Sequence, residues 1–162
     1  MKKVNFIRLF LIMTISMSFL IGGVGCGKKE AQPVDNKPLP ENGFKAEIIV
    51  KDPPLSLKAA SPSVIKTTVK NISEANWPSY GRYSVRLSYH WLNSEGKIIA
   101  DNGLRTDFAK DIMPNKEIEL EAKITTPDKP GNYILDFDMV QEEVAWFKDK
   151  GSKTTQLKVK VE

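Results

Sequence analysis

The clearest pattern in the chain is a strict alternation of apolar and polar residues between positions 83 and 92. The odd positions hold large apolar residues, which are Tyr83, Val85, Leu87, Tyr89 and Trp91. The even positions hold Ser84, Arg86, Ser88 and His90. A period of two is typical of a β-strand with one buried face. Because that face carries three aromatic rings, the strand is predicted to be central and to pack against a second sheet.

Further segments alternate in the same way or follow a turn that pairs them with a neighbour. They are residues 44–50, 64–71, 97–100, 116–125, 132–141, 144–147 and 155–161. Glu142 and Glu143 interrupt the alternation like a bulge, and residues 101–115 show neither period, which indicates a long connection. Tyr133 stands where immunoglobulin-like domains have a tyrosine corner. The pattern predicts an all-β fold, an immunoglobulin-like antiparallel β-sandwich of about seven strands, over residues 43–162.

The first 25 residues differ from the rest of the chain. Lys2, Lys3 and Arg8 precede an apolar run at 9–24. This layout is typical of a secretory signal peptide, and the run is shorter than the roughly 20 residues that a membrane-spanning helix needs. Residues 27–42 are polar and contain three prolines, so we expect a flexible linker there. The predicted organisation is a signal peptide at 1–25, a linker segment at 26–42 and one domain at 43–162.

Cys26 is the only cysteine, so it cannot form an internal disulfide. The residues before it, 23–25, resemble the bacterial lipobox, although Gly23 stands where that motif usually has a branched aliphatic residue. The resemblance implies a lipidated Cys26, with acyl chains such as palmitate, and an anchor on the extracytoplasmic face of the cell membrane. The alternative is an ordinary secreted protein with a chance cysteine at its cleavage site.

The charge balance argues against nucleic acid as a partner. The net charge is +4, but outside the predicted signal peptide 21 basic residues face 20 acidic ones. Such a balance gives no electrostatic footprint for nucleic acid. The sequence also lacks a phosphate-binding glycine loop, metal-ligand spacing and a nucleophile elbow. We therefore expect no cofactor, no metal and no catalytic residues.

The polar face of the 83–92 strand is the first candidate site. Antiparallel pairing with residues 132–141 would place Arg86 opposite Asp138 and Ser88 opposite Asp136. His90 would then lie diagonal to Asp136. An exposed face of this kind is either a polar recognition surface or a row of cross-strand ion pairs.

Aromatic residues and one arginine provide two further candidates. Trp77, Tyr80, Trp146 and Phe147 are expected at one end of the sandwich. There they form either an exposed platform for sugar rings or a protein partner, or a plug that closes the core. Arg105 either clamps a carboxylate or phosphate, or ties down its own loop.

Several segments together resemble a known family of domains. They are Asn71, Trp77, residues 89–92, residues 103–106, Pro127, residues 130–133 and residues 143–147. They are similar to bacterial Ig-like accessory modules, which are often attached to glycosyltransferases and methyltransferases, and distantly to the tryptophan-rich Ig-like domain of autophagy receptors. The resemblance spans about residues 46–161 and implies a non-catalytic binding or scaffolding module.

Together these features lead us to expect a membrane-anchored lipoprotein that is not an enzyme. Its domain would bind a component of the cell envelope, either a polysaccharide or an envelope protein. The alternative is an extracellular protein inhibitor or regulator that acts through the 101–115 connection.

Overall fold

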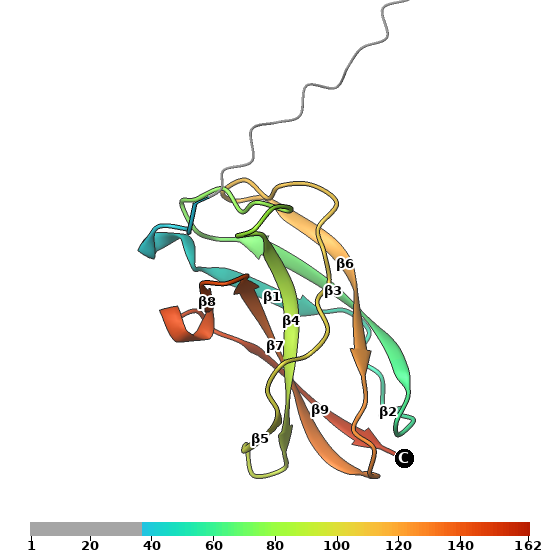
Figure 1. The fold of residues 1–162 in the computed structure, drawn as a ribbon. Helices are drawn as coiled ribbons and strands as arrows, with labels where there is room; N and C mark the ends of the chain where they lie inside the picture. The colour runs from blue at the N-terminus through green and yellow to red at the C-terminus, as the bar shows by residue number, and fades with distance from the viewer. Residues whose placement is uncertain (1–36) are drawn as a thin grey trace, which may run out of the picture. The chain divides into compact units, whose positions relative to one another are not determined.

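The computed structural model describes residues 37–162, which form a sandwich of two β-sheets (Figure 1). The first sheet has the strand order β1 (Ala46–Val50), β3 (Pro62–Asn71) and β6 (Glu117–Thr125). The second has the order β2 (Ser56–Leu57), β9 (Thr155–Val161), β7 (Gly131–Gln141), β4 (Val85–Asn93) and β5 (Ile98–Ala100). A ninth strand, β8 (Ala145–Trp146), pairs with the end of β7. The immunoglobulin-like β-sandwich predicted from the alternation is confirmed.

Seven of these strands are longer than two residues, and all pairs except the short β2–β9 pair are antiparallel. The predicted signal peptide, Cys26 and most of the predicted linker lie outside the described residues. Within residues 37–162, no helix is long and apolar enough to cross a membrane.

The core lies between the sheets, where the predicted apolar face of β4 is buried. Two of its aromatic residues also cross the sandwich with hydrogen bonds to β6. The Tyr89 hydroxyl accepts from the Thr125 backbone N–H at 2.9 Å, and Trp91 Nε1 donates to the Thr125 carbonyl oxygen at 2.9 Å. The predicted tyrosine corner is present as well, because the Tyr133 hydroxyl donates to the Lys129 carbonyl oxygen at 2.9 Å.

One end of the sandwich is closed by aromatic rings. Phe147 contacts Phe44 edge-on with ring centroids 5.1 Å apart, and it contacts Trp77 in the same way at 5.2 Å. Trp77 and Phe147 are fully buried, so the exposed aromatic platform is wrong for these two residues. The reason is that an indole and a phenyl ring at the end of a sandwich lose more water-exposed apolar area by joining the core than by lining a surface.

The chain is already packed on the domain at Leu39, before the single-turn helix η1 (Glu41–Gly43). The Leu39 N–H donates to Gln141 Oε1 at 2.9 Å, and its side chain packs against the core. Trp77 Nε1 donates to the Gly43 carbonyl oxygen at 2.9 Å. These contacts tie residues 39–43 to the end of the sandwich closed by the aromatic rings.

The pairing of β4 with β7 differs from the predicted register by two residues. Arg86 lies opposite Val140, Ser88 opposite Asp138 and His90 opposite Asp136. A shift by two leaves every side chain on the same face, so alternation alone does not distinguish these registers. The bulge predicted at 142–143 is also wrong, because residues 142–144 form a tight turn between β7 and β8.

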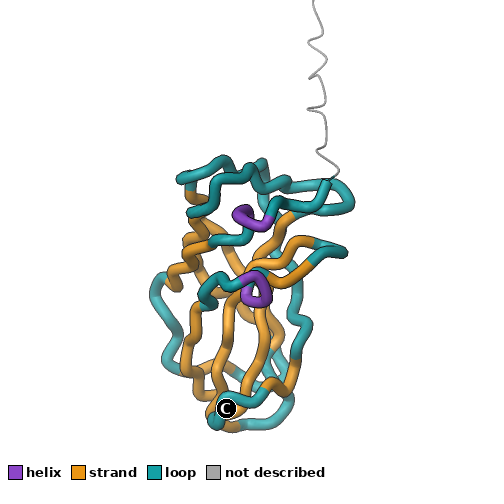
Figure 2. The backbone as a smooth tube through the Cα atoms, turned by 90° about the vertical axis from the view of Figure 1, so that its left-hand side faces the viewer, coloured by secondary structure: helices purple, strands orange, loops and turns teal. Residues whose placement is uncertain are grey.

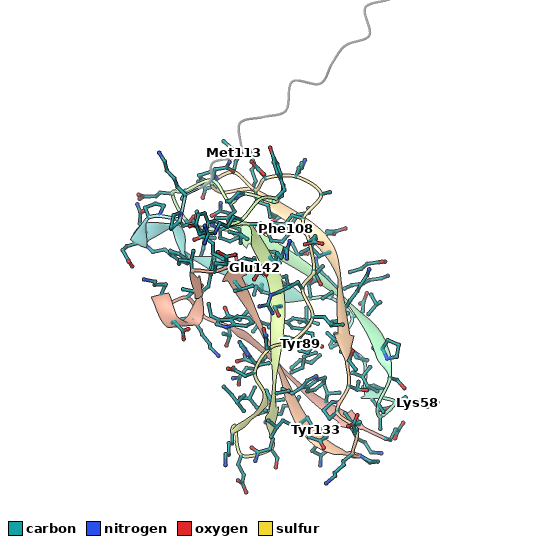
Figure 3. All side chains as sticks on the ribbon, viewed as in Figure 1. Lys58, Tyr89, Phe108, Met113, Tyr133 and Glu142 are labelled. Carbon is teal, nitrogen blue, oxygen red and sulfur yellow. The ribbon has the colours of Figure 1, made fainter. Side chains whose placement is uncertain are left out.

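The 101–115 connection runs along the body of the sandwich. Its Gly103 N–H donates to the Tyr89 carbonyl oxygen at 3.0 Å, and Thr106 forms an isolated antiparallel β-bridge with Leu87. Farther along the connection, Phe108 and Ile112 are buried, and Ile112 forms an isolated antiparallel β-bridge with Trp77. Figure 2 shows the other loops gathered mainly at the two ends of the strands, and Figure 3 places Phe108 near the same end as Met113. Because Asp101 and Gly103 of this connection contact His90 and Ser88, the polar face of β4 is not the open surface that the alternation predicted.

Candidate functional site

Ser88 and His90, on the polar face of β4, are buried beneath the 101–106 segment and the single-turn helix η2 (Lys148–Lys150), whereas Arg86 on the same face is partly exposed. His90 is completely buried, with Nδ1 2.7 Å from the Asp101 carbonyl oxygen and Nε2 3.2 Å from Lys148 Nζ. A ring with its proton on Nδ1 satisfies both contacts, since it donates to the carbonyl and accepts from the ammonium group. His90 therefore joins two segments that follow different strands.

The two aspartates beside His90 are buried as well. Asp138 Oδ1 accepts from the Met139 N–H at 2.7 Å, and its Oδ2 lies 3.3 Å from the Lys148 backbone nitrogen, which donates to it. Oδ2 is also 3.8 Å from His90 Nε2. Asp136 is 7% exposed, and its Oδ1 has no hydrogen-bond partner within residues 37–162. The prediction of an exposed face is wrong for this trio, because sequence alternation does not reveal a loop that later folds over the strand.

Arg105 ties its own segment to the sheet, which is one of its two predicted roles. Its Nε donates to Glu142 Oε1 at 2.9 Å, while Nη1 donates to Ser88 Oγ at 3.0 Å and to the Gly103 carbonyl oxygen at 2.8 Å. Arg86 Nη1 reaches the same Glu142 oxygen at 3.5 Å. Glu142 thus gathers two guanidinium groups on the outer side of the second sheet.

Trp146 is half-buried above this cluster. The centroids of the Trp146 and His90 rings are 4.3 Å apart, and Arg105 Cζ lies 4.9 Å from the centroid of the indole. Lys148 Nζ is 5.7 Å from the same centroid. Contact with two cations and a buried imidazole fixes the indole on the sheet, since its electron-rich face attracts positive charge.

A hollow of about 420 Å³ lies between the 101–105 segment and the β7–β8 turn. Its polar and aromatic walls come from Asp101, Asn102, Arg105, Glu142, Glu143 and Trp146. Figure 3 labels Glu142 in the upper half of the domain, well away from Tyr133 near the lower end. We take this hollow as the candidate site.

The structure brings two of the predicted site residues, Arg105 and Trp146, to the wall of the hollow. Tyr80 is 44% exposed in the loop before β4 and does not line it. The sequence prediction missed Asn102 and Glu142. For Glu142 a signal existed, because the break in alternation at 142–143 marks a change of direction of the chain; for Asn102 the only hint was the glycine that follows it.

Each charge on the walls has an opposite charge close by. Glu142 is bound to Arg105, Glu143 forms an ion pair with Arg82, and Asp101 Oδ1 lies 3.8 Å from Lys148 Nζ. The hydrogen bond from Arg82 to Glu143, reinforced by the charge of the same carboxylate, raises the pKa of Arg82. The hollow is polar but presents little net charge. Among the described residues, no group of three or more His, Cys, Asp or Glu side chains is arranged to hold a metal ion.

No protein-family model matches the chain, and no curated protein matches it. Among solved structures, the CARDB domain of a Pyrococcus furiosus protein is 16% identical with a TM-score of 0.41, over 72% of this chain and 92% of that one. The sporulation control protein of Bacillus subtilis is 14% identical with a TM-score of 0.43, over 73% of this chain and 49% of that one. The β-glucosidase of Listeria innocua in complex with glucose is 11% identical with a TM-score of 0.44, over 72% of this chain and 16% of that one. The immunoglobulin-like assignment rests on the strand order and register described above.

Proposed function

We propose that this chain is a non-catalytic, membrane-anchored lipoprotein on the extracytoplasmic face, and that its domain binds an envelope polysaccharide in the hollow beside Trp146. The anchor is supported by the charged and apolar leader followed by Cys26. Two or more acyl chains on one cysteine would hold the protein stably at the membrane, because each buried methylene contributes about 0.8 kcal/mol.

The composition of the hollow carries the proposal of a sugar ligand. A sugar ring has an apolar C–H face and a rim of hydroxyl groups that both donate and accept hydrogen bonds. The half-buried indole of Trp146 offers an apolar wall, and the Asn102 amide and Asp101 carboxylate are exposed at the rim. A small number of polar groups that converge beside an aromatic wall is the arrangement that binds a small polar ligand.

The balance of charge favours a neutral polymer over a polyanion. Arg105 is the cation on the wall, and it is already bound to Glu142 at 2.9 Å. A phosphate-rich polymer would have to compete with that carboxylate and with Asp101 and Glu143 beside it. Binding of a neutral polysaccharide should therefore depend little on salt, in contrast to binding driven by charge.

The test uses the full-length chain in detergent micelles and purified neutral cell-wall polysaccharide. We expect retention by the polysaccharide, a loss of about tenfold or more in affinity for Trp146→Ala, and little change between low and high salt. Tyr80→Ala is the matched control, because it removes an exposed aromatic side chain outside the hollow. In parallel, Cys26→Ser should move the protein out of the membrane fraction.

Three outcomes would overturn the proposal. If folded Trp146→Ala binds as well as the unchanged chain, the hollow is not the site. If retention occurs only at low salt, the ligand is recognised by charge. If no polysaccharide is retained while an envelope protein co-purifies with the full-length chain, the ligand class is a protein.

A further inference from the structure

Strand β6 forms one edge of the first sheet. It pairs with β3 in an unbroken register from Pro62–Thr125 to Lys70–Glu117, without a bulge. Within residues 37–162 no strand pairs with its other side. A regular edge of nine residues offers a row of backbone donors and acceptors to any extended chain that reaches it.

Hydrogen bonds from the second sheet and from the 101–115 connection show which backbone groups of β6 point outward. The Lys123 N–H lies 3.3 Å from Thr106 Oγ1, and Thr125 is bound through its N–H by Tyr89 and through its carbonyl by Trp91. In an antiparallel strand, alternate residues direct both backbone groups to the same side. The odd-numbered residues of β6 therefore face away from β3.

The sandwich thus covers one half of this edge and leaves the other half open. Three odd-numbered residues remain, which are Glu117, Glu119 and Glu121. The outward N–H and C=O groups of these residues have no hydrogen bond within the described part of the chain. A hollow of about 400 Å³ lies beside Glu119 and Glu121, with residues 105–107 on one wall and residues 119–121 and Lys123 on the other. It provides room for a backbone at the roughly 4.8 Å spacing of neighbouring strands.

The side chains of the same three residues form a row of exposed carboxylates. None of them makes an ion pair within 4 Å in the described chain, although Lys70 and Lys66 lie opposite Glu117 and Glu121 in register. A second copy of β6, paired antiparallel to the first, would bring glutamate opposite glutamate, which is destabilising. The edge therefore disfavours self-association and complements a strand that carries positive charge.

We propose that the open half of β6 binds an extended, basic segment of a partner protein, which adds a fourth strand to the first sheet. The partner backbone pairs with the outward groups of Glu117, Glu119 and Glu121, and its alternate Lys or Arg side chains meet the three carboxylates. This is β-strand addition, in which the main chain provides affinity and alternate side chains provide specificity. Arg105 lines both this hollow and the one beside Trp146, but Glu119 does not line the latter, so a variant at Glu119 tests this proposal alone.

The probe is a capped peptide of about seven residues that alternates Lys with Val or Thr. Fluorescence anisotropy with the full-length chain in detergent micelles measures its binding. We compare a version with Glu in place of Lys, and a version with N-methyl groups on the amides that would pair with β6. The Lys peptide should bind about tenfold or more tightly than either, because one control loses the charge complement and the other loses the backbone hydrogen bonds.

Two single variants locate the site on the protein. Glu119→Lys should weaken binding of the Lys peptide by about tenfold, while Glu47→Lys, an exposed glutamate of the opposite edge strand β1, should leave it nearly unchanged. Circular dichroism checks that both variants fold. If the N-methylated peptide binds as tightly as the Lys peptide, the interaction is one of charge alone. If the Lys peptide binds Glu119→Lys as tightly as the unchanged chain, its site is not on β6. If the unchanged chain sediments as a dimer and Glu119→Lys changes that dimerisation, the edge binds a second copy of the chain. Each of these three results would overturn the proposal.

Discussion

At the scale of single residues, Gly103 decides whether the candidate site exists. It lies against β4 so closely that a Cβ atom there would come within 2.5 Å of the Tyr89 carbonyl oxygen and 2.7 Å of the Tyr89 ring. This approach lets Arg105 reach Ser88 and lets the Asp101 carbonyl accept from His90. One wall of the hollow therefore depends on a missing side chain.

We expect Gly103→Ala to push the 101–106 segment away from β4 and to lower the free energy of unfolding by about 1–3 kcal/mol. The neighbouring exposed residue gives the control, since Asn102→Ala should cost about 0.5 kcal/mol or less. Urea unfolding of the full-length chain in detergent measures both. Equal stability of the two variants would mean that the segment has space to accommodate the methyl group.

His90 illustrates how far a sequence predicts a site at this scale. Its alternating neighbours correctly place it on the face of β4 that points away from the core. Its complete burial depends on Asp101 and Lys148, which are 11 and 58 residues away and carry no local pattern that announces the contact. Residues on a strand are predictable in direction, but what covers them is a property of the tertiary fold.

At the scale of elements, the long strands were predictable, and so were the short strands β5 and β8, which lie within the predicted segments 97–100 and 144–147; only β2 was missed. Strands β3, β6 and β7 are nine to eleven residues long, and the alternation along them is long enough to distinguish it from chance. Strand β2 has two residues, and it exists because it pairs in parallel with the end of β9. Such a pairing depends on the partner strand, so its own sequence does not contain the information.

A side-chain contact fastens this short pair. Ser56 Oγ donates to Glu162 Oε1 at 2.7 Å, and Lys160 Nζ lies 3.0 Å from Oε2 of the same glutamate. The hydrogen bond from Ser56, followed by the hydrogen bond and charge of Lys160, lowers the pKa of the Glu162 side chain. A lowered pKa in the folded state stabilises the fold above the ordinary pKa of the group, and this contribution disappears as the pH falls through the folded value.

Ser56→Ala should therefore raise the pKa of the Glu162 side chain toward its ordinary value. Because the carboxylate is exposed, the effect on stability should be small, and the informative measurement is an NMR titration of the side-chain carboxyl carbon. Ser94→Ala, an exposed serine in the β4–β5 turn, serves as the control and should leave that titration unchanged. An identical pKa in both variants would show that Ser56 does not hold the glutamate in solution.

At the scale of the whole domain, the aromatic end joins segments from the start, middle and end of the described chain. Phe44 precedes β1, Trp77 lies in the loop before β4, and Phe147 follows β8. The three rings pack edge-on, and the Phe147 N–H donates to the Met139 carbonyl oxygen at 2.9 Å. That Trp77 and Phe147 share one end followed from the predicted topology, whereas the place of Phe44 and the choice between plug and platform required the structure.

Removing the ring at the centre of this cluster should affect the whole domain. We expect Phe147→Ala to lower the free energy of unfolding by about 3–5 kcal/mol, because it leaves a cavity between two buried rings. Amides of residues 39–44 should also exchange hydrogen sooner, since Phe44 loses its partner. Val144→Ala, a partly exposed site three residues earlier, should cost only about 0.5 kcal/mol. If the two variants unfold alike, the expected loss of stability at Phe147 is wrong. If Phe147→Ala leaves exchange at residues 39–44 unchanged, the contact between Leu39 and Gln141 holds these residues and the aromatic cluster does not.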